Sequence, residues 1–451
     1  MVIAFAFLAL VLAVSLNGGD SDSVETDEDI TGTDGDDALQ TGDGNDLVQG
    51  LDGNDSIIGG AGDDTLMGDG GDDWLDGGAG INEVHGGDGN DTLVLNDGFD
   101  ALTLYDANGN ISGFEQSLLD GGEGDGDLFD ASGMSENLHL YIGQTNAYAG
   151  TSPLSDRAVT LDGFERYALG SGMDVVEMDL WERGVAVDTG AGRDLVSLTN
   201  AAHQVNLGDG DDDLSIWASD ALDEGMFIDG GDGRDLLEVN SDEGHALAAL
   251  VVDATGSGVL TDTQGGTLHF ANMERFDVMG ARADASATGF GVEITGATTV
   301  LGGTGDDTLA GGDVFGGDGD DVLRGTVLDG GAGDDTLFAS QITDRMTGGE
   351  GTDSFTINRT MRDGYAPNDP LVITDFEPGE SVTMVLHYNE QDTEDYTVSH
   401  PEPVITIEQD SVAHEVRILA DGQPVVILQG TDSLPEGAFT VSVLANDIRP
   451  E

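Results

Sequence analysis

The chain has 451 residues, of which 71 are glycine, 90 are aspartate or glutamate, 13 are lysine or arginine and none is cysteine. Its formal net charge is −77, so the chain repels nucleic acids and anionic membrane surfaces. This repulsion argues against both as partners. The ligands suited to such a chain are cations and basic partners. Without cysteine it has neither disulfides nor thiolate metal sites.

Residues 1–16 form an uninterrupted apolar segment. The segment is shorter than the roughly 18 residues expected of a membrane-spanning helix, and Ala13-Val14-Ser15 offers a small-x-small cleavage pattern. We expect an export signal, with an uncleaved membrane anchor as the main alternative. Residues 17–31 are polar and acidic without periodicity, and we expect a disordered linker there.

Residues 32–95 contain seven consecutive nonapeptides, from Gly32 to Val94. Position eight of each unit is aliphatic. Position six is aspartate in all units except the one that carries Asn82: Asp37, Asp46, Asp55, Asp64, Asp73 and Asp91. Position four is always glycine: Gly35, Gly44, Gly53, Gly62, Gly71, Gly80 and Gly89. Fixed self-similarity of this kind indicates a repeat architecture.

Each of these positions has a physical role. The glycines permit a tight turn with positive φ, and the last three residues alternate as a short strand does. Two nonapeptides then make one flat coil, so aspartates two units apart lie in adjacent coils on one edge. Carboxylates and turn carbonyls are the oxygen ligands of a hard divalent cation. The block therefore predicts a ladder of cation sites, interrupted on one edge at Ile81 and Asn82.

The block resembles the hemolysin-type calcium-binding repeat of RTX proteins, GGxGxDxUx. The resemblance implies an all-β fold, a parallel β-roll or β-solenoid, that binds several Ca²⁺ ions through the position-six aspartates and the carbonyls of the neighbouring glycines. It also implies a protein exported by a bacterium and folded by calcium outside the cell. The acidic charge and the single aliphatic side chain per nonapeptide predict a chain largely unfolded without Ca²⁺.

In residues 96–300 the repeat loosens without disappearing. Four units keep the glycine, the aspartate and the aliphatic residue, about one coil apart, with candidate ligands Asp174, Asp194, Asp212 and Asp235. We expect a degenerate β-solenoid with calcium turns on one edge and plain turns on the other. The unit from Gly121 to Phe129 has one residue too many before Asp127, so Asp127 is left outside the ligand set.

In residues 301–357 the repeat tightens into a second calcium-binding roll. Its units begin at Gly302, Gly316, Gly330 and Gly348, and the shorter spacing of the first three predicts five-residue plain turns such as Gly311–Phe315. The candidate ligands would stack on a single edge: Asp307, Asp321, Asp335 and Asp353, with Gly305, Gly319, Gly333 and Gly351.

Residues 358–451 have fewer glycines and more alternating strands, which predicts a β-rich C-terminal cap. The segment from Leu371 to Met384 resembles the one that follows the repeats in many RTX proteins of type I export, with Glu380 where those usually have aspartate. The resemblance implies an uncleaved secretion signal here. Because residues 1–16 offer a different export route, the route stays open.

No catalytic motif stands out. HExxH, GxSxG and P-loop patterns are missing, and no repeat-free region is long enough for a catalytic domain. We therefore expect a secreted, non-enzymatic structural or surface-interaction module with an unidentified cell-surface or matrix partner. The alternatives are a calcium-dependent β-helix lyase or epimerase, with Arg157, Arg166 and Arg183 as uronate contacts, and the RTX portion of an exported toxin.

Overall fold

The structure, a computed structural model, describes residues 26–96, 102–105, 111–115, 117–143, 147–150, 159–179, 184–199, 203–218, 221–222, 225–241, 246–361, 370–389 and 402–446. The apolar segment 1–16 lies outside these residues, and so do residues 17–25 of the acidic linker. Arg157 and Arg183 also lie outside them.

Contacts divide the chain into two compact units, Met1–Asp235 and Leu236–Glu451. The boundary falls inside the segment 96–300 that the repeat pattern suggested as one region. Every regular element in the described residues is a β-strand, and most strand pairs are parallel. Within the same residues, no helix is long and apolar enough to cross a membrane. The prediction of an all-β, mostly parallel fold is confirmed.

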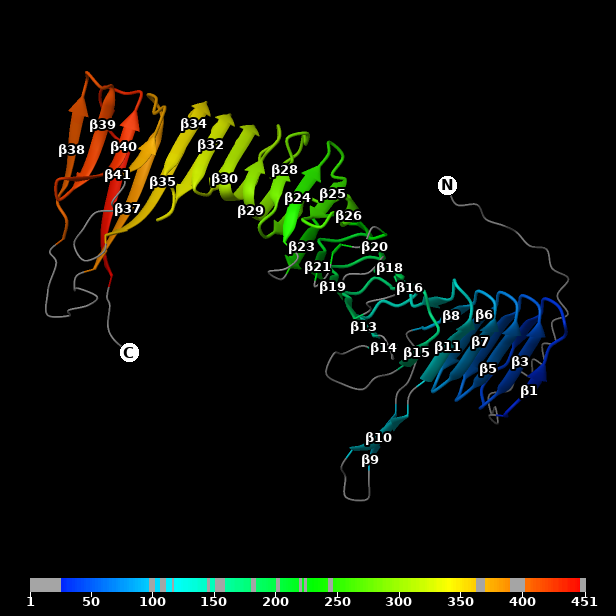
Figure 1. The fold of residues 1–451 in the computed structure, drawn as a ribbon. Helices are drawn as coiled ribbons and strands as arrows, with labels where there is room; N and C mark the ends of the chain where they lie inside the picture. The colour runs from blue at the N-terminus through cyan, green and yellow to red at the C-terminus, as the bar shows by residue number, and fades with distance from the viewer. Residues whose placement is uncertain are drawn as a thin grey trace. The chain divides into compact units, whose positions relative to one another are not determined.

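The N-terminal unit begins with a regular roll (Figure 1, blue to cyan). Alternate strands pair in parallel with a shift of eighteen residues, so that Asp29 lies beside Leu47 and Ala38 beside Ser56. One coil is therefore two nonapeptides, as predicted. The strands are β1 (Asp29–Thr31), β2 (Ala38–Gln40), β3 (Leu47–Asp52), β4 (Ser56–Ala61), β5 (Thr65–Gly70), β6 (Trp74–Ala79), β7 (Glu83–Asp88) and β8 (Thr92–Val94).

The expected linker 17–31 ends earlier than predicted. Strand β1 occupies its last three residues and pairs in register with β3. The prediction of disorder was wrong for Asp29–Thr31, because an acidic and polar composition does not reveal that the first regular coil offers these residues an unpaired sheet edge.

The remainder of the N-terminal unit continues both faces of the roll. One face runs β1, β3, β5, β7, β11 and β15, then through antiparallel β14 and β13 to β17, β19 and β21; the other runs β2, β4, β6, β8, β12, β16, β18, β20 and β22. Strands β9 and β10 form a separate hairpin. The bounds are β9 (Leu102–Tyr105), β10 (Ile111–Glu115), β11 (Ser117–Glu123), β12 (Leu128–Asp130), β13 (His139–Gly143), β14 (Ala147–Gly150), β15 (Val159–Asp162), β16 (Arg166–Ala168), β17 (Val175–Asp179), β18 (Ala186–Asp188), β19 (Leu195–Thr199), β20 (Gln204–Asn206), β21 (Asp213–Ala218) and β22 (Phe227–Asp229).

The C-terminal unit is also two-faced. Its strands are β23 (Leu236–Ser241), β24 (Leu247–Val252), β25 (Gly258–Asp262), β26 (Thr267–Ala271), β27 (Arg275–Val278), β28 (Arg282–Asp284), β29 (Glu293–Leu301), β30 (Thr308–Asp318), β31 (Val322–Arg324), β32 (Val327–Ala332), β33 (Thr336–Ala339), β34 (Arg345–Glu350), β35 (Ser354–Met361), β36 (Leu371–Ile373), β37 (Ser381–Asn389), β38 (Ile405–Asp410), β39 (Glu415–Ala420), β40 (Gln423–Gln429) and β41 (Phe439–Asn446).

Two details of this unit differ from the expectation. Gly311–Phe315, expected as a plain turn, is part of the long strand β30, whose two halves pair with β31 and β32 on the two faces. The parallel stacking also continues past residue 357, because β37 pairs with β35 and β41 pairs with β37. The C-terminal region is β-rich as predicted, but it shares its sheets with the roll.

The core is a thin stack of the position-eight side chains. Val48 and Leu66 from one face and Ile57 and Leu75 from the other are fully buried. Burying one such side chain contributes about 1.5–3 kcal/mol, whereas ordering the backbone costs about 1–2 kcal/mol for every residue. Two aliphatic side chains therefore do not stabilise a coil of eighteen residues alone, and the turns at the edges matter.

Candidate metal centres at the edges of the roll

The position-six residues are linked from coil to coil by hydrogen bonds that we call the inner ladder. The backbone N–H of each donates to the side-chain oxygen Oδ1 of the position-six residue in the following coil. On one edge of the N-terminal roll, such bonds join Asp46, Asp64 and Asn82 at 2.9 Å. On the opposite edge, bonds of 2.7 to 2.8 Å join Asp37, Asp55, Asp73, Asp91 and Asp127.

The same ladder recurs in two further runs. All fourteen aspartates predicted as ligands stand on such ladders, and all of them except Asp37 are buried. In the later coils of the N-terminal unit, bonds of 2.7 to 2.9 Å join Asp174, Asp194, Asp212 and Asp235. In the C-terminal unit, bonds of 2.8 to 2.9 Å join Asp307, Asp321, Asp335 and Asp353.

Asp127 belongs to the ladder, although its unit carries one residue too many. The N–H of Asp91 donates to Asp127 Oδ1 at 2.8 Å, and Asp127 is fully buried. The strands on either side keep their register, since Gly122 pairs with Gly87 and Leu128 with Thr92. The additional residue is therefore absorbed within the turn. The prediction that left Asp127 out was wrong, because it counted residues along the chain and did not take account of the strand pairing across the sheet.

The second carboxylate oxygen of these aspartates is the chemically unusual atom. Along the described ranges, Oδ2 is buried and lacks a hydrogen-bond donor in Asp46, Asp55, Asp64, Asp73, Asp91, Asp212, Asp321 and Asp335. A buried carboxylate oxygen without a partner carries a large desolvation penalty. Repetition of the same orphan oxygen in coil after coil indicates a missing positive partner.

The repeat glycines leave room beside these oxygens. A Cβ at Gly59, position one of its unit, would lie 2.5 Å from Asp64 Oδ2 and 2.8 Å from the carbonyl oxygen of Gly77 in the next coil. At position four, Gly62 has φ +139°, and a Cβ there would overlap the carbonyl oxygen of Gly44. Glycine is thus required because carbonyl and carboxylate oxygens converge between coils.

The predicted position-four glycines share this conformation except at the start of each roll. Gly35 and Gly305 are not among the residues of positive φ, and nothing lies within 4 Å of a Cβ at Gly35. The φ angle lies between 130° and 142° in the other predicted glycines: Gly44, Gly53, Gly62, Gly71, Gly89, Gly319, Gly333 and Gly351. Gly35 is therefore uncrowded, whereas a Cβ at Gly305 would lie 2.3 Å from the carbonyl carbon of Phe290.

The first aspartates of two ladders are also satisfied within the protein. Asp37 Oδ2 accepts the N–H and the hydroxyl of Thr33, at 2.5 and 2.9 Å. Asp307 accepts the N–H groups of Val292 and Gly303 at 2.8 and 3.0 Å. Asp37 and Asp307 therefore close the ends of their ladders, and their need for a cation is weaker.

Asn82 keeps the ladder and changes its chemistry. Its Oδ1 accepts the N–H of Asp64, as an aspartate would, but its amide Nδ2 donates to the carbonyl oxygen of Gly78 at 3.2 Å. The amide therefore donates to a carbonyl oxygen whose counterparts in the other turns could face a cation. This geometry supports the predicted interruption on that edge.

Burial changes the acidity of the ladder carboxyls. It raises the pKa of Asp64, Asp73, Asp174 and Asp212 to about 6, with neighbouring aspartates adding to the effect. It raises the pKa of Asp91, Asp321 and Asp335 to about 7. Without a cation, these carboxyls hold protons far more readily than exposed aspartates do.

Taken together, the turns fit a hard divalent cation bound by one carboxylate per coil and several backbone carbonyls. No group of three or more His, Cys, Asp or Glu side chains suited to a metal occurs among the described residues. That finding agrees with a site in which most ligands are backbone oxygens. Bound there, Ca²⁺ would supply the positive charge that the buried carboxylates lack.

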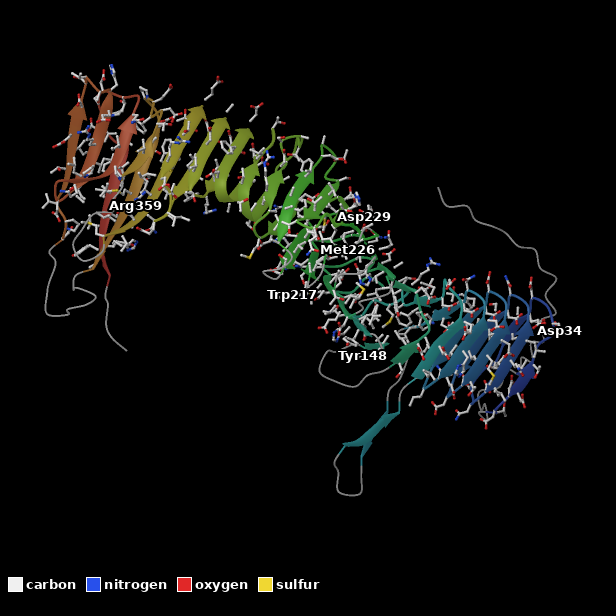
Figure 2. All side chains as sticks on the ribbon, viewed as in Figure 1. Asp34, Tyr148, Trp217, Met226, Asp229 and Arg359 are labelled. Atoms are coloured by element: carbon white, nitrogen blue, oxygen red, sulfur yellow. The ribbon has the colours of Figure 1, made fainter. Side chains whose placement is uncertain are left out.

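A second set of hydrogen bonds, the outer ladder, runs along the position-five residues. Here the N–H of each residue donates to Oδ1 of the position-five residue in the preceding coil, as Asp63 does to Asn45 and Asp72 to Asn54, at 3.0 and 3.1 Å. The C-terminal unit repeats it from Asp320 to Asp306 at 2.9 Å. Oxygen-bearing side chains accordingly line the turns of the N-terminal roll (Figure 2). Sequence reasoning missed this role, although position five is mostly Asp or Asn.

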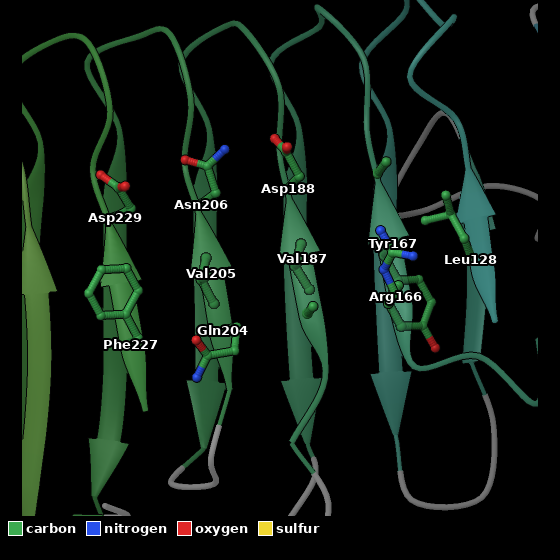
Figure 3. Close-up of a pocket in the computed structure, with 12 residues that line it drawn as sticks. Leu128, Arg166, Tyr167, Val187, Asp188, Gln204, Val205, Asn206, Phe227 and Asp229 are labelled. Carbon is green, nitrogen blue, oxygen red and sulfur yellow. The ribbon is translucent and has the colours of Figure 1, made fainter. Parts of the chain in front are cut away.

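One groove lies on the outer face of the N-terminal unit, across β12, β16, β18, β20 and β22 (Figure 3). Its volume is about 320 Å³. The small side chains of Ala168 and Ala186 create the groove, because the facing positions on neighbouring strands carry larger side chains. One row of side chains is Asp188, Asn206 and Asp229, and the other includes Leu128, Arg166, Gln204 and Phe227.

Comparison with known families agrees with the turn geometry. The family model of the RTX calcium-binding nonapeptide repeat (4 copies) matches residues 31–66, 67–102, 295–313, 314–341 and 326–355. These segments of the chain are RTX-type calcium-binding nonapeptide repeats. Among curated proteins no match was found. The RTX matches cover the two regular rolls, and the ladder geometry extends the same turn to Asp127 and to the run from Asp174 to Asp235. They support Ca²⁺ as the cation.

The first prediction separates the ladder bond from the cation. Asp64→Asn keeps an Oδ1 acceptor for the Asp46 N–H but removes the charged Oδ2, which makes the turn like that of Asn82. We expect it to weaken calcium binding at that turn at least about tenfold, since even indirect partners of a metal are worth roughly 10–100-fold. Calorimetric titration would measure this.

Asp63→Asn is the matched control, because it removes the same charge from the adjacent exposed residue and preserves its acceptor for the Ile81 N–H. Equal calcium binding by both variants would contradict the assignment of Asp64 Oδ2 as a ligand.

The second prediction concerns pH. The folded, metal-free protein binds protons on Asp64, Asp91 and Asp335 up to about pH 6–7, whereas the unfolded chain releases them near pH 4. Between those limits the folded state holds more protons, so its free energy of unfolding falls as the pH rises. With saturating calcium the trend should reverse, because the ion requires ionised ligands. Circular dichroism of metal-stripped and calcium-loaded protein at about pH 5 and pH 8 measures the folded fraction and tests both signs; a metal-free folded fraction that rises over this range would refute the argument.

Proposed function

We propose that the protein is secreted and that calcium folds it outside the cell, where it acts as a non-enzymatic structural or surface-interaction module. The observation that carries this proposal is the repeated, buried and unpartnered Oδ2 atom of the inner ladder. A carboxylate is retained in such a position when a cation completes its coordination.

The net charge supports the same conclusion. A chain of formal charge −77 has strong self-repulsion when compact, and its thin core does not offset that repulsion. Ions bound between coils neutralise charge where it is most concentrated. Calcium is scarce in the cytosol and abundant outside, so the chain would leave the cell unfolded and fold on arrival. Residues 1–16 or the segment 371–384 would provide the export signal.

The third prediction tests calcium-dependent folding directly. Far-ultraviolet circular dichroism of the full chain should show little β-structure in EDTA and a cooperative gain of β-structure in millimolar calcium. Magnesium at the same concentration and ionic strength is the control, because its strict octahedral geometry suits a carbonyl-rich turn poorly. Identical spectra in EDTA and calcium would refute the proposal.

The groove across β12 to β22 supports an interaction role and indicates a partner class. Asp188, Asn206 and Asp229 present planar acceptors and donors in a row, and Phe227 is 37 % exposed at one end. Paired hydroxyls of a sugar ring match such oxygens and amides, and its apolar face matches an exposed aromatic ring. The two carboxylates and the acidic chain disfavour anionic sugars. We therefore propose a neutral saccharide of a cell surface or matrix.

The fourth prediction is that Phe227→Ala lowers the affinity for neutral oligosaccharides at least about fivefold, a loss of about 1 kcal/mol for one aromatic contact. Phe315→Ala is the control, because Phe315 is 39 % exposed and is not one of the residues that line the groove. Binding is measured on immobilised glycans with calcium present. Release of shortened, unsaturated products from a polyuronate would favour the lyase alternative, and inversion at C5 without cleavage would favour the epimerase alternative; in both, Arg166 contacts the substrate. Equal binding by both variants would contradict the groove proposal.

A further inference from the structure

A turn outside the repeats copies the geometry of the calcium turns. Met346 pairs with Ile373 before the turn, and Ser354 pairs with Ser381 after it. The intervening segments Gly348–Asp353 and Asp375–Glu380 are equally long. Glu380 therefore stands across from Asp353, at position six of a coil in which the repeat glycines are replaced.

The Glu380 side chain is buried as a ladder aspartate is, but it accepts an N–H bond from its own turn rather than from the preceding coil. It is 3 % exposed, and its Oε2 accepts the N–H of Glu377 at 2.8 Å. Its Oε1 has no hydrogen-bond donor, and neither has Oδ2 of Asp353. Asp353 Oδ1 already accepts the N–H of Asp335 at 2.9 Å. Apart from the contact between the two carboxyl groups themselves, each keeps one buried oxygen without a donor.

The two carboxyl groups lie against each other. Burial and the neighbouring carboxyl raise the pKa of Glu380, and burial raises the pKa of Asp353. Without a cation, the pair holds together only by sharing a proton between its oxygens. Such a pair is a poor structural contact at neutral pH and a good pair of ligands for a divalent ion.

Asp375 has a different task in the same turn. Its two carboxylate oxygens accept the N–H groups of Gly348 and Gly349, at 3.0 and 2.9 Å. It fixes the Asp375–Glu380 turn against the last repeat coil, and each of its two oxygens accepts one of these amides. Gly349 and Gly351 have φ of +108° and +142°, the same conformation as their counterparts in preceding coils. Their carbonyl oxygens are therefore oriented toward the following coil, which here is the Asp375–Glu380 turn.

We infer that Asp353 and Glu380 form a further Ca²⁺ site, with backbone carbonyls of the Gly348–Asp353 turn, outside the nonapeptide repeats. The site joins the repeat roll to β36 and β37, which flank the Asp375–Glu380 turn and pair with β40 and β41. Calcium then orders part of the C-terminal region, although that region contains no repeat. This inference rests on the proposed calcium-dependent folding.

The test compares Glu380→Gln with Glu377→Gln in the full-length chain. Glu377 lies in the same turn and contributes only its backbone N–H and carbonyl groups to the contact, and its side chain is exposed. Native mass spectrometry in a calcium series should show one bound ion fewer for Glu380→Gln and an unchanged number for Glu377→Gln. Hydrogen exchange should show that Ser381–Leu386 of β37 loses calcium-dependent protection only in Glu380→Gln.

Circular dichroism in saturating calcium reports separately whether the repeat rolls of each variant fold. If the rolls fold and Glu380→Gln retains the wild-type ion count and protection, the site is overturned while calcium-dependent folding stands. If the wild type gains no structure with calcium, both fail. A more stable Glu380→Gln with an unchanged ion count would identify a proton-sharing pair and would also overturn the site.

Discussion

Burial of one carboxylate per repeat turn is the constraint on which the rest of this fold depends. The inner ladder places an aspartate between neighbouring coils because its Oδ1 completes the hydrogen bonding of a backbone N–H. The same placement strands Oδ2 among glycine carbonyls, away from water. The coil is thus built so that its backbone is satisfied by the protein and its charge by a cation. Glycine at positions one and four follows from this arrangement, since any Cβ would meet oxygen atoms.

The two ladders divide the work of holding coils together. Inner bonds run from a coil to the following one, and outer bonds run back to the preceding one, as Asp46 to Asp64 and Asp63 to Asn45 show. Each coil is therefore hydrogen-bonded to both of its neighbours. The outer ladder consists of exposed residues such as Asp63 and Asn45 and depends on no ion. In the calcium-dependent folding that we propose, the ion supplies the stability that the thin aliphatic stack does not provide.

Much of this architecture could be predicted from the sequence, because the nonapeptide fixes glycine, aspartate and aliphatic positions with a period that only a coil explains. The fold class, the coil of two units and the ladder of aspartates all followed from that period. Asp127 was missed because a turn tolerates an additional residue when the strands on both sides keep their pairing. Glu380 was noticed as a departure from aspartate, but its register became visible only through the pairing of β35 with β37. The groove had no signal, since Ala168 and Asp188 are neighbours only across strands.

The pairing of each residue with the one eighteen positions further on also bears on how such a chain varies over generations. Gain or loss of a whole coil in the N-terminal roll leaves every remaining side chain on its own face and every aspartate on its own edge. Gain or loss of a single nonapeptide instead exchanges the two faces for all the following coils and interrupts both ladders. Length can thus change in steps of two units at little structural cost, which makes copy number the variable that evolution adjusts most easily in this roll.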